Sequence, residues 1–88
     1  MAMSKGNYLD SQSSQQLLQN FLRKIRLEEG LRQIDLAEKL GKPQSYISKY
    51  ENGEKHLDIL ELKNICNAMG ISLVDFVQQF ESLINSQD

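Results

Sequence analysis

One short segment, residues 44–50, carries side chains whose types and spacing suit recognition of another molecule. On an α-helix with 3.6 residues per turn, one side of the segment would carry neutral hydrogen-bonding groups and a single cation, namely Gln44, Ser45, Ser48 and Lys49. The opposite side would carry Ile47 and Tyr50 and face the core. Glutamine can pair with adenine, lysine can donate to guanine, and serine can bind either base. An ordinary solvent-facing surface would more often carry Glu and Lys, so the pattern alone leaves both interpretations open.

Groups that could bind phosphate surround this segment. Helix N-termini attract phosphate through free backbone N–H groups and the helix dipole. The expected helix starts near the segment carry Arg32, Gln33, Lys42, Asn52, Lys55 and His56. Contacts of this kind position a protein on DNA. Tyr46 lies between the core side and the solvent side, where it could press on a sugar-phosphate strand or serve as a half-buried packing residue.

Catalytic and metal-binding patterns are not recognisable in the chain. It contains one histidine and one cysteine, which excludes a zinc cluster and an intramolecular disulfide. His56 has no Ser or Asp partner at a recognisable spacing, and Cys66 lies in an apolar stretch where a small buried residue is expected. We therefore expect no enzymatic activity, no cofactor and no metal site.

Five helices are expected to position the segment. Apolar residues recur at steps of three and four from Ser14 onward and predict a first helix that ends at Gly30. The second helix is expected from about Gln33 to the stop at Gly41, and the third from about Gln44 to Asn52. The expected fold is all-α, a compact five-helix bundle in which the second and third helices form a helix-turn-helix.

The last two helices have clear start signals. Asp58 and Glu61 form a capping box before the fourth helix, which Gly70 ends. Ser72 is expected to cap the fifth helix, with Asp75 at its third position.

The charges are unevenly distributed along the chain, which bears on whether it could bind a nucleic acid. The net charge of −2 argues against one. However, residues 1–56 hold nine Lys and Arg against seven Asp and Glu, whereas residues 57–88 hold one Lys against five acids. The half with the candidate DNA contacts is therefore basic, and the acidic half would face away.

The length of 88 residues suits a single domain. Residues 1–13 lack periodicity and are expected to form a disordered lead-in, followed by one domain over residues 14–86. The chain has no apolar run long enough to span a membrane. We expect no membrane partner and a cytoplasmic, nucleoid-associated location.

Three motifs resemble a known family. The run Gly30–Gly41 (GLRQIDLAEKLG) is similar to the first half of the lambda Cro and repressor-like (Xre) helix-turn-helix, and Gln44–Gly53 (QSYISKYENG) is similar to the second half. The run Ala68–Leu73 (AMGISL) resembles the junction between the family's fourth and fifth helices. Together the resemblance covers roughly residues 17–80, with the motifs in the family's order, and it implies sequence-specific DNA binding.

The resemblance also implies roles for individual residues. Gln44, Ser45 and Lys49 match base-contacting positions, and Ser48 between them would contact the DNA backbone. Gln33 would bind a phosphate and could also brace Gln44.

A structural ion pair is implied as well. Arg26 matches an arginine that pairs with the glutamate matched by Glu51, which would join the first helix to the end of the third. Two departures concern helix caps: Arg32 stands where the family usually has Ser, Thr or Asn, and Pro43 stands where it commonly has Ser or Thr. Each lost cap costs about 1 kcal/mol.

The fifth helix carries an apolar stripe longer than a small core needs. Its second half predicts a homodimer interface within residues 72–86, formed by Val77, Phe80, Leu83 and Ile84. Helix-turn-helix proteins commonly pair two recognition helices one DNA turn apart. The alternative is that Leu83 and Ile84 fray with the tail.

The sequence therefore predicts a transcriptional regulator that binds double-stranded DNA, as a dimeric repressor at an inverted-repeat operator. An antitoxin that also binds a toxin protein is an alternative, for which the fifth helix and Ile34 offer apolar surface. A restriction–modification controller and a phage repressor are further alternatives.

Overall fold

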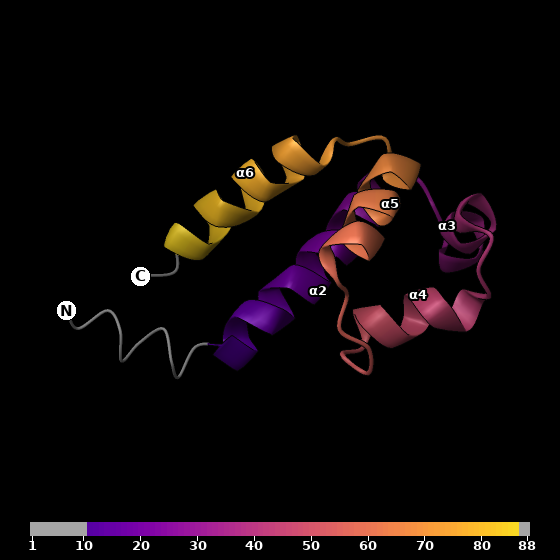
Figure 1. The fold of residues 1–88 in the computed structure, drawn as a ribbon, viewed down its shortest axis with the longest axis horizontal. Helices are drawn as coiled ribbons and strands as arrows, with labels where there is room; N and C mark the ends of the chain where they lie inside the picture. Colours follow the sequence, from indigo (N-terminus) through magenta and orange to yellow (C-terminus); the bar gives the residue numbers. More distant parts are fainter. Residues whose placement is uncertain (1–10, 87–88) are drawn as a thin grey trace.

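Five α-helices follow one another through residues 11–86, the part of the 88-residue chain that this computed structural model describes (Figure 1). They are α2 (Ser11–Glu28), α3 (Gln33–Leu40), α4 (Gln44–Glu51), α5 (Ile59–Met69) and α6 (Leu73–Asn85). No strand occurs in this range. The expected all-α five-helix architecture is confirmed. None of these helices combines the length and apolar character that crossing a bilayer requires.

The first helix begins earlier than the sequence pattern predicted. It starts at Ser11 rather than Ser14, so residues 11–13 of the expected lead-in are helical. Ser and Gln are acceptable helix formers, and no Gly or Pro interrupts the stretch. The prediction missed this turn because it relied on apolar periodicity, which these polar residues lack. The rest of the expected lead-in, residues 1–10, lies outside the described residues.

The turn between α3 and α4 consists of Gly41, Lys42 and Pro43. Gly41 adopts a left-handed conformation with φ of 67°, and the Lys42 N–H donates to Ala37 O at 2.9 Å. This is the hydrogen bond of a Schellman ending, which suits glycine. Pro43 lacks an N–H and has φ of −70°, so it ends one helix and precedes the next without leaving an unpaired donor. The two helices are therefore held close together.

A second left-handed glycine follows α4 and approaches the first helix. Gly53 has φ of 83°, and a Cβ atom there would lie 3.0 Å from Nε2 of Gln19. Both the backbone conformation and the contact with α2 favour glycine at this position.

The core lies where all five helices meet. Its buried apolar residues are Leu22, Ile25, Leu36, Ala37, Ile47, Tyr50, Ile65, Cys66, Met69 and Phe76. Helices α2 and α6 lie side by side along one arm of the molecule (Figure 1). Three aromatic rings join them there, because Phe21 lies 5.2 Å from Phe76 and 6.2 Å from Phe80 between ring centroids.

The predicted start signals of α5 and α6 are confirmed. Asp58 Oδ1 accepts from the Glu61 N–H at 2.7 Å, and Glu61 Oε1 accepts from the Asp58 N–H at 3.0 Å. Ser72 Oγ accepts from the Asp75 N–H at 3.0 Å. Each cap satisfies backbone donors that a helix start would otherwise leave unpaired.

Candidate nucleic-acid interface

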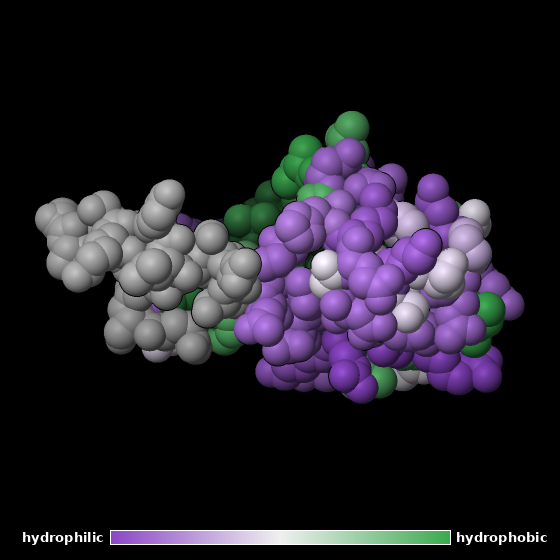
Figure 2. Space-filling model, turned by 90° about the horizontal axis from the view of Figure 1, so that it is seen from below, coloured by the Kyte–Doolittle hydropathy of each residue, from purple (hydrophilic) through white to green (hydrophobic). Residues whose placement is uncertain are grey.

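Helix α4 presents the polar face that the helical wheel predicted. Gln44, Ser45 and Lys49 are exposed and Ser48 is half-buried, whereas Ile47 and Tyr50 are buried in the core. The side of the molecule on which α4 lies is predominantly hydrophilic (Figure 2). Among residues 11–86, Lys49 takes part in no ion pair. The four candidate base-contacting residues thus lie on one accessible strip of one short helix.

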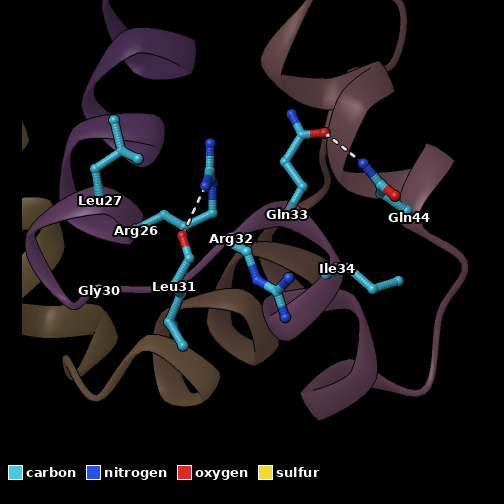
Figure 3. Close-up of a pocket in the computed structure, with 8 residues that line it drawn as sticks. All are labelled: Arg26, Leu27, Gly30, Leu31, Arg32, Gln33, Ile34 and Gln44. Atoms are coloured by element: carbon cyan, nitrogen blue, oxygen red, sulfur yellow. Dashed lines mark hydrogen bonds between the residues drawn. The ribbon is translucent and has the colours of Figure 1, made fainter.

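An ion pair buried beneath this helix joins α2 to the end of α4. Arg26 donates from Nε to Glu51 Oε2 at 2.7 Å and from Nη2 to Glu51 Oε1 at 3.0 Å. Its Nη1 donates to Leu31 O at 2.7 Å, as Figure 3 shows. The two side chains are only 6% and 3% exposed. The pair that the resemblance implied is therefore present, with its donors directed to three acceptors.

Gln33 extends this pair to the exposed Gln44. Gln33 Nε2 donates to Glu51 Oε1 at 3.0 Å. Gln44 Nε2 donates to Gln33 Oε1 at 3.2 Å, the bond drawn between the two glutamines in Figure 3. Because an ionised carboxylate only accepts, the Gln33 amide must direct its NH₂ at Glu51 and its oxygen at Gln44. Gln44 therefore keeps its own oxygen and one amide hydrogen for a ligand, the pair of groups that binds adenine.

A shallow open hollow lies beside the two glutamines. Leu27, Leu31 and Ile34 contribute apolar surface to it. Its polar lining comes from the two glutamines and from Arg26 and Arg32 (Figure 3). Apolar surface next to a candidate base-contacting amide can contact the methyl group of thymine.

Arg32, at the start of α3, is paired with an acid that sequence reasoning did not assign to it. Its guanidinium donates to both carboxylate oxygens of Asp35 at 2.9 and 3.0 Å, and its backbone N–H donates to Asp35 Oδ2 at 2.8 Å. The side-chain hydrogen bond from Arg32 is the main cause that lowers the pKa of Asp35 to about 2.

These bonds modify the expected loss of a cap on α3. The Arg32 side chain makes no cap hydrogen bond to the helix backbone. However, Asp35 satisfies the backbone N–H of Arg32, which is half of a capping box. The spacing of three residues between the acid and the arginine was the available signal. At the start of α4, Pro43 provides no side-chain cap, as predicted.

Two of the candidate phosphate-binding lysines lie over the ring of Tyr46. The ammonium groups of Lys42 and Lys55 lie 5.2 and 5.7 Å from the centroid of its ring. Lys55 also forms an ion pair of 3.1 Å with Glu61, and the Tyr46 hydroxyl donates to the same carboxylate oxygen at 3.4 Å. Glu61 was recognised from sequence only as a capping residue, because its approach to Lys55 depends on the path of the loop between α4 and α5.

The other loop candidate, Asn52, lies at the C-terminal end of α4. Its Nδ2 donates to Ser48 Oγ at 3.3 Å. The Ser48 hydroxyl keeps its own hydrogen to donate to a further partner, and Asn52 is exposed. No group of three or more potential metal ligands converges within residues 11–86.

The predicted dimer residues on α6 have different environments. Val77 is exposed, whereas Leu83 and Ile84 are half-buried. Phe80 is half-buried and stacks with Phe21 and Phe76, so it also contributes to the chain's own core. The assignment of these residues to a dimer interface stays a prediction.

Comparison with known proteins places these features in context. The model of a helix-turn-helix family, HTH_3, matches residues 22–76. A protein of Sinorhizobium fredii (strain NBRC 101917 / NGR234), called uncharacterized HTH-type transcriptional regulator y4dJ, is 34% identical over 58 residues, which are 66% of this chain and 74% of that protein.

Solved structures are similar over most of the chain. An XRE-family like protein from Pseudomonas syringae pv. tomato str. DC3000 has a TM-score of 0.79 and 30% identity, covering 94% of this chain and 98% of that one. The restriction-modification controller protein C.Esp1396I has a TM-score of 0.74 and 32% identity, covering 81% and 91%. The same controller has been solved as a tetramer with its natural 35 base-pair operator, with a TM-score of 0.72 and 32% identity, covering 78% and 91%.

Proposed function

The chain belongs to the helix-turn-helix family of lambda Cro and repressor-like (Xre) proteins and is a DNA-binding transcriptional regulator; we propose that it acts as a dimeric repressor at an inverted-repeat operator. The observation that carries the proposal is the fixed orientation of Gln44. Its amide is tied through Gln33 and Glu51 to a buried arginine, so it meets DNA with a defined donor and acceptor. Because the Gln44 side chain is already held in this orientation, it loses less conformational entropy when it binds.

Base recognition is assigned to the exposed strip of α4. Gln44 would bind adenine through its remaining donor and acceptor, and Lys49 would donate to guanine. Ser45 would bind a base edge beside Gln44. Ser48, whose hydroxyl accepts from Asn52, would lie closer to the sugar-phosphate backbone of the DNA. These residues come from one helix, which is the element that the major groove admits.

Phosphate contacts are assigned to the residues that flank this strip: Gln33, Arg32, Lys42, Tyr46, Asn52 and Lys55. Lys42 and Lys55 both lie over the ring of Tyr46, and Arg32 and Gln33 lie at the start of α3. Phosphate contacts from such flanking residues fix the register of a recognition helix on the duplex.

A dimer would match the two-fold symmetry of an inverted repeat. The exposed Val77 supports an interface on α6, and the half-buried Phe80, Leu83 and Ile84 follow it on the same helix. Val74, one turn before, is 65% exposed and widens the apolar surface. The tetramer of the similar controller on its operator is a precedent for assembly on DNA.

Selection of binding sites from a random duplex pool, at physiological salt, tests the proposal. Recovery of a two-fold-symmetric site with half-sites about one helical turn apart is the expected result. Recovery of nothing above background would overturn it. In that case a protein partner that copurifies in stoichiometric amount would favour the antitoxin alternative.

The likeness to C.Esp1396I favours a second candidate, a restriction–modification controller. The selected site would then lie next to genes for a restriction endonuclease and a DNA methyltransferase in the source genome. A site next to neither gene would favour a general or phage repressor.

A further inference from the structure

We propose that Glu61 is a specificity-determining residue that holds Lys55 away from DNA phosphates until α4 is seated in the groove. The proposal rests on the proposed function, because it concerns how this protein distinguishes its operator from other DNA. In the free protein Lys55 would be bound to Glu61, and on the operator a phosphate would replace the carboxylate.

The two oxygens of Glu61 have separate partners. Oε1 accepts from the Asp58 N–H at 3.0 Å and completes the capping box of α5. Oε2 lies 3.1 Å from Nζ of Lys55 and also accepts from the Tyr46 hydroxyl. The cap fixes the carboxylate at the helix start, so Lys55 meets an anchored acid rather than a mobile one.

Lys55 is restrained by its surroundings as well as by charge. Its side chain is 33% exposed and that of Glu61 is 30% exposed, so solvent screens this pair less than an open surface pair. Nζ of Lys55 also lies over the Tyr46 ring. The pKa of Glu61 is lowered, first by the Asp58 backbone hydrogen bond and next by Lys55, which is consistent with a carboxylate stabilised in its charged form.

Lys42 provides the contrast on the same ring. It lies 5.2 Å from the Tyr46 centroid but is exposed and belongs to no ion pair within residues 11–86. It can therefore meet a phosphate in any loosely bound complex, whereas Lys55 must first leave Glu61.

This difference bears on specificity because non-specific DNA binding is almost entirely attraction to phosphates. A lysine that is free in every complex strengthens binding to all sequences equally. A lysine released only by close docking strengthens mainly the operator complex. Glu61 would thus lower affinity for random DNA more than affinity for the operator.

Glu61→Gln tests the proposal, since glutamine keeps an acceptor for the Asp58 N–H but removes the charge. On a random-sequence duplex we expect binding about threefold tighter near 50 mM salt, with a salt slope steeper by about 0.9. Affinity for the selected operator should rise less, so the ratio between the two should fall. Adding Lys55→Gln should remove the gain.

Glu28→Gln is the matched control, because it makes the same change in net charge at an exposed carboxylate that lies 4.0 Å from a lysine, Lys24, which has no assigned DNA contact. Equal gains in Glu61→Gln and Glu28→Gln, with the operator still selected, would overturn the inference alone. Wild-type protein that binds neither duplex would overturn the proposed function and the inference with it.

A measurement on the wild-type protein covers the case in which Glu61→Gln folds poorly. The ammonium resonance of Lys55, followed by NMR, should keep its free-protein position on the random duplex and shift on the operator. An equal shift on both duplexes would contradict the proposal.

Discussion

The amide of Gln33 donates to Glu51 at 3.0 Å, and this bond determines which way the Gln33 amide faces. Its oxygen is consequently directed at Gln44, which donates to it at 3.2 Å. The orientation of an exposed side chain on α4 thus depends on a carboxylate that is almost completely buried.

Replacing Gln33 should weaken base discrimination at a position that Gln33 does not contact. Gln33→Leu removes the acceptor for Gln44, so preference at the base pair assigned to Gln44 should relax. Gln44→Ala should cost about 1–3 kcal/mol there, and the double variant should cost no more discrimination than Gln44→Ala alone. Competition binding with single-base operator variants measures this. Additive losses would show that the two glutamines act independently.

Breaking the Arg26–Glu51 pair should destabilise the fold strongly. Arg26→Leu leaves a buried carboxylate without its cation, at a cost of about 3–5 kcal/mol. Urea unfolding measures the loss. Lys24→Gln is the control, because Lys24 and Glu28 form an exposed pair of 4.0 Å that is worth about 0–1 kcal/mol. Similar losses in the two variants would contradict the structural role of the buried pair.

Tyr50→Phe should leave stability unchanged or raise it. Tyr50 Oη is buried and has no hydrogen-bond partner among the described residues, and an unpaired buried polar group costs about 1–3 kcal/mol. Urea unfolding again provides the measurement. Tyr46→Phe is the comparison, since its hydroxyl does have a partner, Glu61. A clear loss of stability in Tyr50→Phe would mean that the hydroxyl is satisfied in solution.

The bond from Arg32 should make Asp35 resist protonation. The pKa of Asp35 is lowered from 3.8 to about 2, chiefly by the side-chain hydrogen bond with Arg32. A lowered folded-state pKa means that its stabilising effect is complete above about pH 4 and is lost as the pH falls towards 2. NMR titration of the carboxyl should show this, and Arg32→Gln should move the pKa back towards 3.8. An unchanged midpoint in Arg32→Gln would exclude the bond in solution.

Charge placed on α6 should separate the proposed dimer. Val77→Glu introduces a carboxylate at an exposed position, so it should disrupt association without opening the core. Sedimentation should show a monomer, and circular dichroism should show unchanged helix content. Substituting Leu83 and Ile84 with charged residues is a second test. Persistence of a dimer in all these variants would move the interface away from α6.

Sequence alone was sufficient for the parts of the fold that rest on local rules. The capping box of Asp58 and Glu61, and the side-chain cap from Ser72, follow from residue types at fixed spacings. The burial of Ile47 and Tyr50 follows from helical periodicity.

Features that depend on tertiary geometry could not be predicted in the same way. The contact of Lys55 with Glu61 depends on the path of the loop after α4. The stacking of Phe80 on Phe21 depends on how α6 packs against α2, two helices that are far apart in the sequence. The Arg26–Glu51 pair was available only through the family resemblance, because no local rule connects residues 25 positions apart.

The reactivity of Cys66 can be used to measure how often the helical core opens. The thiol is completely buried in the core, and burial raises its pKa to about 11. Since the thiolate is the reactive form, a thiol reagent at neutral pH should modify Cys66 only during transient opening of the core. The labelling rate therefore measures how often the bundle opens, and its slowing when DNA is added would measure how much the bound duplex holds the bundle closed.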